Sequence, residues 1–311
     1  MKAVILDSDT LGSDIDLSSI SGLVDQLERW GTTQHDDVAE RLEGATIAIT
    51  NKVVIDGAIM AALPELEMIA VTATGANNID MQSARARGIT VANVSAYGTQ
   101  SVAQHTLMMM LTLANRLPLY QHDVASHQWE KAPFFCLQAH PTMQLSGKHL
   151  VIAGSGELGS AVAELARAFG MQVSFCARAG ASDDTRPSLA SLLPQADVIS
   201  MHCPLTSDTH HLIDHDALSL MQPHALLINC GRGSLIDEHA ALEALKAQRL
   251  GGLGVDVLPE EPPRKGHELI DALSSGTLNL IVTPHSAWIS PEARQNIVEL
   301  TANNIRNFLK N

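Results

Sequence analysis

Three side chains of complementary chemistry follow three separate apolar segments in the second half of this 311-residue chain. Arg232 stands in CGRGS after ALLIN, Glu261 in LPEEPP shortly after GGLGV, and His285 in TPHSAW after LNLIV. Arginine can hold a carboxylate through its planar fork of N–H donors, and histidine can carry a proton near neutral pH. A carboxylate beside the histidine would favour its charged form and fix its ring. Such a set could bind an acid and deliver a proton to a neighbouring carbonyl group.

Each of these residues also has an ordinary structural interpretation. The chain contains 14 histidines, most of which must serve at the surface or in packing. Arg232 could pair with a nearby acid, and Glu260 stands beside Glu261, so either acid could be a solvated side chain. Asp256 could bond an amide of a ligand or cap a turn. The places of Arg232 and His285 favour a site, because ligands of open parallel sheets bind beyond the carboxyl ends of the strands.

Apolar segments of strand length alternate with segments of helical periodicity along most of the chain, which predicts parallel sheets with helices on both faces. Strands are expected at 2–7, 46–50, 66–72, 90–93, 150–153, 173–176, 198–202, 225–229, 252–257 and 280–283. Helices are expected at 18–30, 56–63, 81–87, 100–116, 238–247 and 291–310, and residues 120–146 are expected to be irregular. The helix over 100–116 contains Met108–Met110 and is apolar all round, which predicts that it is buried, with a second subunit as one candidate for its cover.

The motif GSGELG at 154–159 stands between a predicted strand and a predicted helix. Gly154 would allow a tight turn, Gly156 would let the backbone approach a diphosphate, and Gly159 would allow close packing of helix and strand. The N–H groups and the positive end of the helix could then hold the diphosphate. A glycine-rich structural turn is the alternative. The complete strand–turn–helix–strand order favours a dinucleotide site.

The end of the second strand of this unit bears on the choice of dinucleotide. An acid usually stands there when the ribose hydroxyls of NAD are bound, but this chain has Ala177 followed by Arg178. A small neutral residue removes repulsion toward a 2′-phosphate, and an arginine can bond it. The pattern predicts NADP(H) in preference to NAD(H). The alternative is that Arg178 is a solvated surface residue, and Asp183 and Asp184 nearby complicate the prediction.

Composition narrows the classes of partner. The formal net charge of −14 argues against a nucleic-acid ligand and an anionic membrane surface. No apolar run reaches the roughly 18 to 20 residues that span a bilayer, and no signal peptide is recognisable at the N-terminus. The four cysteines have no metal-ligand spacing, so we expect no metal and reduced thiols in a cytoplasmic protein.

These motifs together resemble the D-isomer-specific 2-hydroxyacid dehydrogenase family, and within it the bacterial glycerate dehydrogenases, also called hydroxypyruvate reductases. The resemblance is carried over almost the whole length by TATGANNID (72–80), SVAQHT (101–106), GSGELG (154–159), HCPLTSDT (202–209), LINCGRGSLIDE (227–238), GVDVLPEEPP (254–263) and TPHSAW (283–288). It implies catalytic roles for Arg232, Glu261 and His285, which selects Glu261 over Glu260. One departure is Ala177, where many members keep an acid.

The resemblance also implies binding residues. Backbone amides at Thr74, Gly75 and Ala76 would receive the substrate carboxylate, together with Arg232. Cys203 and Pro204 would flank the adenosine, and Asp256 and the carbonyl of Cys230 would hold the nicotinamide amide. The full set of expected dinucleotide contacts is Ser101, Gly154, Gly156, Glu157, Leu158, Gly159, Ala177, Arg178, Cys203, Pro204, Thr209, Cys230, Gly231 and Asp256.

The implied architecture is α/β, with two doubly wound parallel-sheet domains. A Rossmann dinucleotide-binding domain, residues 96–287, would be inserted in a flavodoxin-like substrate domain formed by residues 1–95 and 288–311. Hinges are expected near Val94-Ser95 and Ser286-Ala287, and family members typically form homodimers through the nucleotide domain. Whether Trp129 or Trp288 shapes the pocket stays open.

The resulting hypothesis is an NAD(P)-dependent oxidoreductase of a small 2-keto or 2-hydroxy acid. Hydroxypyruvate is the first expected substrate and glyoxylate the second. One alternative is a different D-2-hydroxy acid, or an unusual donor such as formate or phosphite. A second alternative is a non-catalytic protein that responds to a dinucleotide by changing its interactions.

Overall fold

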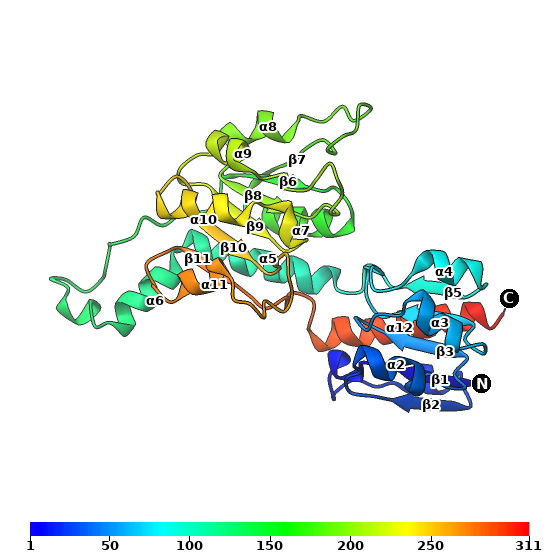
Figure 1. Ribbon diagram of the computed structural model, residues 1–311. Helices are drawn as coiled ribbons and strands as arrows, with labels where there is room; N and C mark the ends of the chain where they lie inside the picture. Colours follow the sequence, from blue (N-terminus) through cyan, green and yellow to red (C-terminus); the bar gives the residue numbers. More distant parts are fainter. Residues whose placement is uncertain (311) are drawn as a thin grey trace. The chain divides into compact units, whose positions relative to one another are not determined.

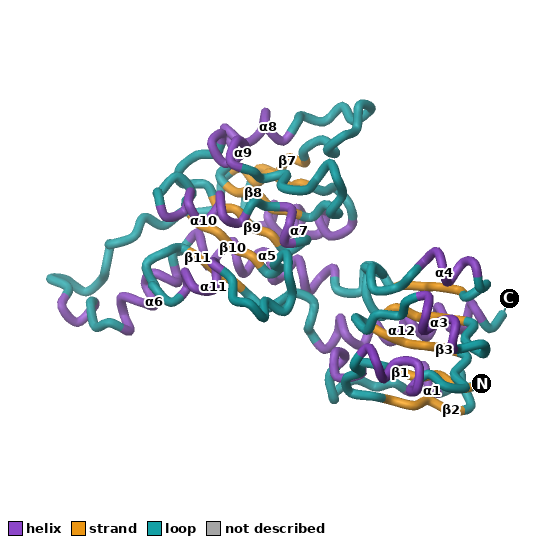
Figure 2. The backbone as a smooth tube through the Cα atoms, viewed as in Figure 1, coloured by secondary structure: helices purple, strands orange, loops and turns teal. Residues whose placement is uncertain are grey.

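The computed structural model describes residues 1–310, and within them the chain forms two compact units (Figure 1). Unit 1 consists of Met1–Gly98 and the C-terminal segment that begins at Ile289, and unit 2 is Thr99–Trp288. Unit 2 is therefore inserted in the sequence of unit 1. Each unit is built around one parallel sheet, whose strands are drawn in orange in Figure 2.

The sheet of unit 1 has the strand order β2-β1-β3-β4-β5, and every pairing is parallel. This is the order of flavodoxin-like sheets, in which the order of strand addition reverses between β1 and β3. Its strands are β1 (Lys2–Ile5), β2 (Gln26–Arg29), β3 (Ile47–Thr50), β4 (Met68–Val71) and β5 (Thr90–Asn93).

Helices cover both faces of this sheet. They are α1 (Ser18–Ser21), α2 (Val38–Arg41), α3 (Gly57–Ala62), α4 (Met81–Ala86) and α12 (Pro291–Phe308). Helices α2, α3 and α4 bury apolar side chains together with one face of the sheet, among them Val38, Ile59 and Ala84. Helix α12 contacts α1, β4 and β5. The last helix of the chain therefore completes the unit that the first 98 residues begin.

The predicted helix over 18–30 is wrong. Only Ser18–Ser21 is helical, and Gln26–Arg29 forms the edge strand β2, which pairs in parallel with β1. The helix ends at Gly22, a residue that is costly in a helix interior. The apolar spacing of the segment fits a helix, but pairing with β1 overrides it.

The sheet of unit 2 has the order β11-β10-β9-β8-β6-β7 and is also wholly parallel. The order in which strands are added to the sheet reverses between β6 and β8, and this places a crevice at the carboxyl ends of these two strands. The strands are β6 (His149–Ala153), β7 (Gln172–Phe175), β8 (Val198–Met201), β9 (Leu226–Asn229), β10 (Gly252–Val255) and β11 (Leu280–Val282). The prediction of two doubly wound parallel-sheet units, one inserted in the other, is confirmed.

Two cores cover the two faces of this sheet, as alternating side chains of the strands require. One lies under α5 (Thr99–Ala114) and α7 (Glu157–Ala168) and includes Leu150 and Ile152. The other includes Val151 and Ala153. It lies under α8 (Leu189–Leu192), α9 (His215–Leu220), α10 (Glu238–Lys246) and α11 (Glu268–Leu273).

The segment after α5 is more regular than predicted. Residues Leu117–Ala125 form α6, with Pro118 in its first turn, where the missing N–H costs nothing. In the methionine run, Met109 and Met110 are buried, whereas Met108 is 39% exposed in the single chain, so burial of this side chain against a second subunit stays a prediction. Across residues 1–310, none of the helices combines the length and the apolar character needed to cross a membrane.

Candidate functional site

The glycine-rich turn connects β6 to α7, and its three glycines meet different surroundings. Gly154 has a φ of +110°, and a Cβ there would lie 2.4 Å from the carbonyl oxygen of His202. A Cβ on Gly159 would lie 2.0 Å from the carbonyl oxygen of Gly154. A Cβ on Gly156 would meet no atom within 4 Å. The protein itself therefore requires glycine at 154 and 159, while position 156 has room that a ligand could use.

A cavity of about 490 Å³ opens at this turn, beside the carboxyl ends of β6, β7 and β8. It contains seven of the expected dinucleotide contacts: Gly154, Gly156, Ala177, Arg178, Cys203, Pro204 and Thr209. His202 also lines it, and burial lowers the pKa of its imidazole to about 4, so the ring is neutral near pH 7. Thr209 shapes the rim by donating to the carbonyl of Pro204 at 2.7 Å. The cavity lies at the switch point of the sheet, and its volume is within the usual range of small-molecule sites.

The loop after β7 brings two arginines to this cavity, of which only Arg178 was predicted. The carboxylate of Asp184 organises the loop by accepting the backbone N–H groups of Arg178 (2.8 Å) and Arg186 (3.1 Å). It also receives two hydrogen bonds from the guanidinium of Arg186, which hold the pKa of Asp184 well below its usual range. Arg178 has an exposed pairing with Asp183 at 3.4 Å. Arg186 was missed because it lies in a loop without any periodic pattern.

The most direct juxtaposition among the predicted catalytic residues joins His285 and Glu261. Nδ1 of His285 lies 2.7 Å from Oε2 of Glu261. The other carboxylate oxygen of Glu261 accepts the backbone N–H of Leu258 at 2.8 Å, which fixes the carboxylate. Both side chains are about one-third exposed, so a small molecule can reach them. The pair leaves Nε2 of His285 as the nitrogen that can exchange a proton with a ligand.

Asp256, at the end of β10, bonds to the segment that carries His285. Its carboxylate accepts the backbone N–H groups of Ser286 (2.9 Å) and Ala287 (3.0 Å), and its carbonyl accepts that of His285 (2.7 Å). The side chain is 2% exposed. Asp256 therefore holds the backbone around His285, a structural role in addition to its expected contact with a nicotinamide amide.

Arg232 follows β9, and its guanidinium is exposed. It donates to the carbonyl of Gly231 at 2.8 Å, and within residues 1–310 it forms no ion pair with an acid. The backbone is held by Asn229, whose amide donates to the carbonyl of Arg232 and accepts from Gly231. A Cβ on Gly233 would lie 2.2 Å from the carbonyl carbon of Leu258. The loop of Arg232 is thus packed directly against the loop that leads to Glu261.

The remaining expected contacts of unit 2 lie outside the cavity. Ser101 donates its hydroxyl to the carbonyl of Ala287 at 2.6 Å. Glu157 begins α7 and accepts the hydroxyl of Thr99 at 2.9 Å. Cys230 is buried against Met109. Leu158 and Gly159 lie in the first turn of α7, and Gly231 lies between Cys230 and Arg232.

Glu238 is a buried acid that the sequence did not single out. Its Oε2 lies 2.9 Å from Nε2 of His267, and its side chain is 6% exposed. Burial, followed by the charges of Glu268, Glu261 and Asp237, raises the pKa of Glu238 to about 8. It looked like an ordinary first-turn helix acid, because its burial arises only from tertiary packing.

In unit 1, the expected carboxylate site lies after β4. Among the hydrogen bonds of residues 1–310, none has the backbone N–H of Thr74, Gly75 or Ala76 as its donor. The carbonyl of Thr74 accepts the side-chain amide of Asn93 at 2.6 Å, which anchors the segment. Such N–H groups at the end of a parallel strand suit an anion.

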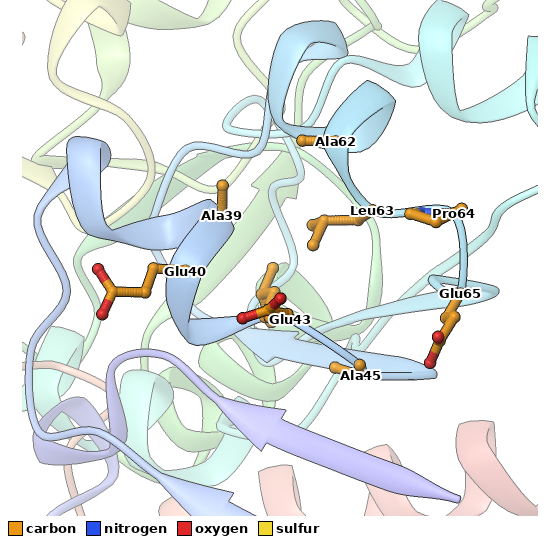
Figure 3. A pocket seen from close by; sticks show the side chains of 10 residues that line it. Ala39, Glu40, Glu43, Ala45, Ala62, Leu63, Pro64 and Glu65 are labelled. Carbon is orange, nitrogen blue, oxygen red and sulfur yellow. The ribbon is translucent and has the colours of Figure 1, made fainter.

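A second cavity in unit 1, of about 520 Å³, lies between the connections α2–β3 and α3–β4 (Figure 3). These connections stand at the amino ends of the strands, away from the carboxyl ends where ligands of such sheets bind. Glu40, Glu43 and Glu65 surround an apolar interior, and no cationic side chain lines it. This cavity does not suit an anionic substrate. Within residues 1–310, no cluster of His, Cys, Asp and Glu has the geometry of a metal site.

Comparison with known proteins agrees with this arrangement. Residues 107–287 match the family model described as D-isomer specific 2-hydroxyacid dehydrogenase, NAD binding domain. A glycerate dehydrogenase of Methylorubrum extorquens is 38% identical over 308 residues, which cover 99% of this chain and 96% of that protein. A hydroxypyruvate reductase of Blautia hydrogenotrophica is 31% identical over 318 residues, covering 100% and 97%.

A solved structure extends the likeness to the whole chain. The acyclic imino acid reductase Bsp5, in complex with NADPH and D-Arg, superposes with a TM-score of 0.82 at 27% sequence identity. The match covers 100% of this chain and 97% of that one. The fold of the whole chain is therefore similar to that of a solved reductase in complex with NADPH.

Proposed function

Because the chain belongs to the D-isomer-specific 2-hydroxyacid dehydrogenase family, we propose that it reduces hydroxypyruvate, and glyoxylate as a second substrate, to the corresponding 2-hydroxy acid. The observation that carries the proposal is the contact of 2.7 Å between His285 and Glu261. The names of the relatives that span nearly the whole chain favour hydroxypyruvate. A bound nicotinamide dinucleotide would supply the hydride.

His285 is the proposed proton donor. Its Nδ1 faces Glu261, so Nε2 is left to protonate the oxygen of the ketone as the alkoxide forms. The carboxylate of Glu261 stabilises the charged ring and fixes its orientation, because Leu258 holds that carboxylate in place. The pair thus supplies one proton for each ketone reduced.

Arg232 is the proposed anchor of the substrate carboxylate. Its exposed guanidinium has the planar fork that carboxylates bind, and its loop is packed against the loop that precedes Glu261. The backbone N–H groups of Thr74, Gly75 and Ala76 are proposed as the second set of donors to that carboxylate. In this proposal unit 1 is the substrate domain and unit 2 the dinucleotide-binding domain, with hinges near the chain crossings.

NADP(H) is the proposed cofactor in preference to NAD(H). Ala177 leaves room at the end of β7, and Arg178 has a single long pairing with Asp183 that a 2′-phosphate could replace. Arg186 adds a second cation to the cavity, although Asp184 already neutralises it. The solved relative that binds NADPH supports the same choice. Asp256 and the carbonyl of Cys230 are proposed to hold the nicotinamide amide.

The chain is further proposed to form a homodimer through unit 2. Figure 1 shows α6 and the segment after it leaving the body of this unit. Five large apolar side chains are at least 44% exposed there: Leu117, Val124, Trp129, Phe134 and Phe135. A second copy would cover them, because exposed apolar groups of this kind mark interaction sites. In such a dimer Trp129 would lie against the second copy. The four cysteines are free thiols, consistent with the proposed cytoplasmic location.

The test is the initial rate of hydroxypyruvate reduction with NADPH and with NADH, with glyoxylate as the second substrate. The proposal expects turnover with hydroxypyruvate and a higher kcat/KM with NADPH. Turnover with an NADH preference would retain the dehydrogenase and overturn the role of Arg178. Tight dinucleotide binding without turnover of either acid would overturn the proposed reaction and favour a non-catalytic protein that responds to the dinucleotide.

A further inference from the structure

Two side chains of helix α5, one helical turn apart, form hydrogen bonds to residues on either side of His285. Ser101 donates its hydroxyl to the carbonyl of Ala287 at 2.6 Å. His105, four residues later and therefore on the same face of the helix, has Nε2 at 3.1 Å from Oγ1 of Thr283. Neither His105 nor Thr283 has a role in the function proposed above.

The contacts of His105 continue to Asp256 as a directed chain. Oγ1 of Thr283 lies 2.5 Å from Oδ1 of Asp256. A carboxylate oxygen accepts, so the threonine hydroxyl donates to it and its own oxygen is left to accept the N–H of His105. The same direction makes Nε2 of His105 the donor, because the hydroxyl proton of Thr283 is already committed to Asp256. Burial lowers the pKa of His105, against the opposing charge of Asp256.

Asp256 connects this series of hydrogen bonds to the segment 285–287. Asp256 accepts three backbone N–H groups of this segment. The N–H of His285 donates to its carbonyl, and those of Ser286 and Ala287 donate to its carboxylate. His285 has a φ of +54°, which is uncommon for a residue with a side chain. Such a conformation persists only where the surroundings hold it. Asp256 supplies that hold, and Thr283 and His105 fix Asp256.

We propose that His105 and Thr283 are positioning residues that set the orientation of His285 through the carboxylate of Asp256. The inference rests on the proposed function, since it assigns a purpose to the orientation of the proton donor. Neither residue is among those that line the cavity at the glycine-rich turn. A buried carboxylate that loses one of its donors rotates or recruits another, and the left-handed backbone at His285 loses its support.

The experiment compares two variants of Thr283 in the full chain. Thr283→Val keeps the shape and removes the hydroxyl, whereas Thr283→Ser keeps the hydroxyl. We expect Thr283→Val to lower kcat by about 10- to 100-fold, as a misplaced catalytic group does, with little change in the KM of the keto acid. Thr283→Ser should restore most of the rate. Thr277→Val, at an exposed threonine of the same unit, is the control for the substitution itself.

A second pair of variants tests the other end of this hydrogen-bond network, at His105. His105→Gln can place an amide donor near the position of Nε2, and His105→Leu cannot. The same ordering of rates is expected, with His105→Gln above His105→Leu. Equal kcat values for Thr283→Val and Thr283→Ser, together with equal values for the two His105 variants, would overturn the inference.

Amide hydrogen exchange provides a readout that does not depend on activity. Thr283→Val should speed exchange at Ser286 and Ala287, with no change at the strand amides of β6 and β8. If wild-type protein reduces no 2-keto acid, the proposed function fails, and this measurement still decides whether the network holds the segment. Unchanged exchange at Ser286 and Ala287 in both Thr283→Val and His105→Leu would overturn the network.

Discussion

Gly159 lies so close to Gly154 that a Cβ atom on Gly159 would be only 2.0 Å from the carbonyl oxygen of Gly154. By contrast, a Cβ atom on Gly156 would face open space. The three glycines of one motif thus have separable purposes. Two of them serve the packing of β6 against α7, and the third matters only when a ligand approaches.

Gly156→Ala should therefore fold normally and bind dinucleotide poorly. We expect its melting temperature to fall by only a few degrees, because Ala in place of a favoured residue at a helix N-cap costs about 1 kcal/mol. Its Kd for NADPH should rise at least about tenfold, or about 1.4 kcal/mol. Gly159→Ala should instead lose about 1 to 3 kcal/mol of stability through overpacking. Fluorescence titration and thermal unfolding separate the two, and wild-type affinity in Gly156→Ala would contradict the placement of the diphosphate.

His285→Ala should lower turnover of hydroxypyruvate by about 10²- to 10⁴-fold, the usual share of a general acid, while NADPH binding stays near wild type. Glu261→Gln should reduce turnover less, because the ring keeps a hydrogen-bond partner but loses its anionic neighbour. Glu260→Gln is the matched control, since Glu260 is the exposed neighbour of Glu261. Equal turnover of the Glu260 and Glu261 variants would contradict the pairing.

Arg178→Ala should lower kcat/KM with NADPH by about 10- to 100-fold, the range for a hydrogen bond to a charged group, and leave kcat/KM with NADH nearly unchanged. The reason is that the ribose of NADH carries no 2′-phosphate. Arg186→Ala, measured in parallel, separates the two cations of the loop. If neither variant changes the ratio of the two cofactors, the loop does not read the 2′-phosphate.

Glu238 should make stability fall with rising pH. Its pKa of about 8 in the folded protein exceeds the ordinary value of 4.5. Between these values the folded state keeps a proton that the unfolded state releases, so stability decreases across this window and the full loss is present above pH 8. The melting temperature of Glu238→Gln relative to wild type should therefore rise between pH 5 and pH 8.5. Glu243→Gln, at an exposed acid of the same helix, should show no such rise; an equal rise there would refute the assignment.

Replacing Phe134 and Phe135 together by Ser should weaken the proposed dimer. Phe135 is 88% exposed in the single chain, so this change removes interface area without disturbing a core. Light scattering coupled to size exclusion should give the dimer mass for wild type and a larger monomer fraction for the variant. A monomeric wild type at micromolar concentration would contradict the dimer.

The sequence predicts the parts of the fold that depend on local pattern. Most buried strands of both sheets are continuous apolar runs, and the turn at Gly154 has a local signature. The edge strand β2 escaped prediction because its apolar spacing also fits a helix, and only the pairing with β1 decides between them. Helix α6 lies partly in the segment 120–146 that is expected to be irregular. A proline can follow one helix or begin the next, and Pro118 stands in the first turn of α6.

The site likewise has parts that a local sequence pattern predicts and parts that depend on tertiary packing. Arg232 and His285 could be proposed from their places after strands, whereas the family resemblance was needed to select Glu261 over Glu260. The structure brings Glu261 to His285. The surroundings of these residues could not be predicted. Arg186 reaches the cavity only because Asp184 folds its loop, and the burial of Glu238 depends on packing between distant segments. The link from His105 to Asp256 joins residues about 150 positions apart, beyond the reach of any local pattern.

The place of α12 has a consequence for how the protein is made. Ile297, Val298 and Ile305 are fully buried, and their helix contacts β4 and β5 of the sheet formed by the first 98 residues. A ribosome adds about 5 to 20 residues each second, so the nascent sheet waits for all of unit 2 to be synthesised before its last helix emerges. During that time an apolar face of the sheet is uncovered. Unit 2, by contrast, is one continuous segment, Thr99–Trp288, and all of its strands are synthesised before α12.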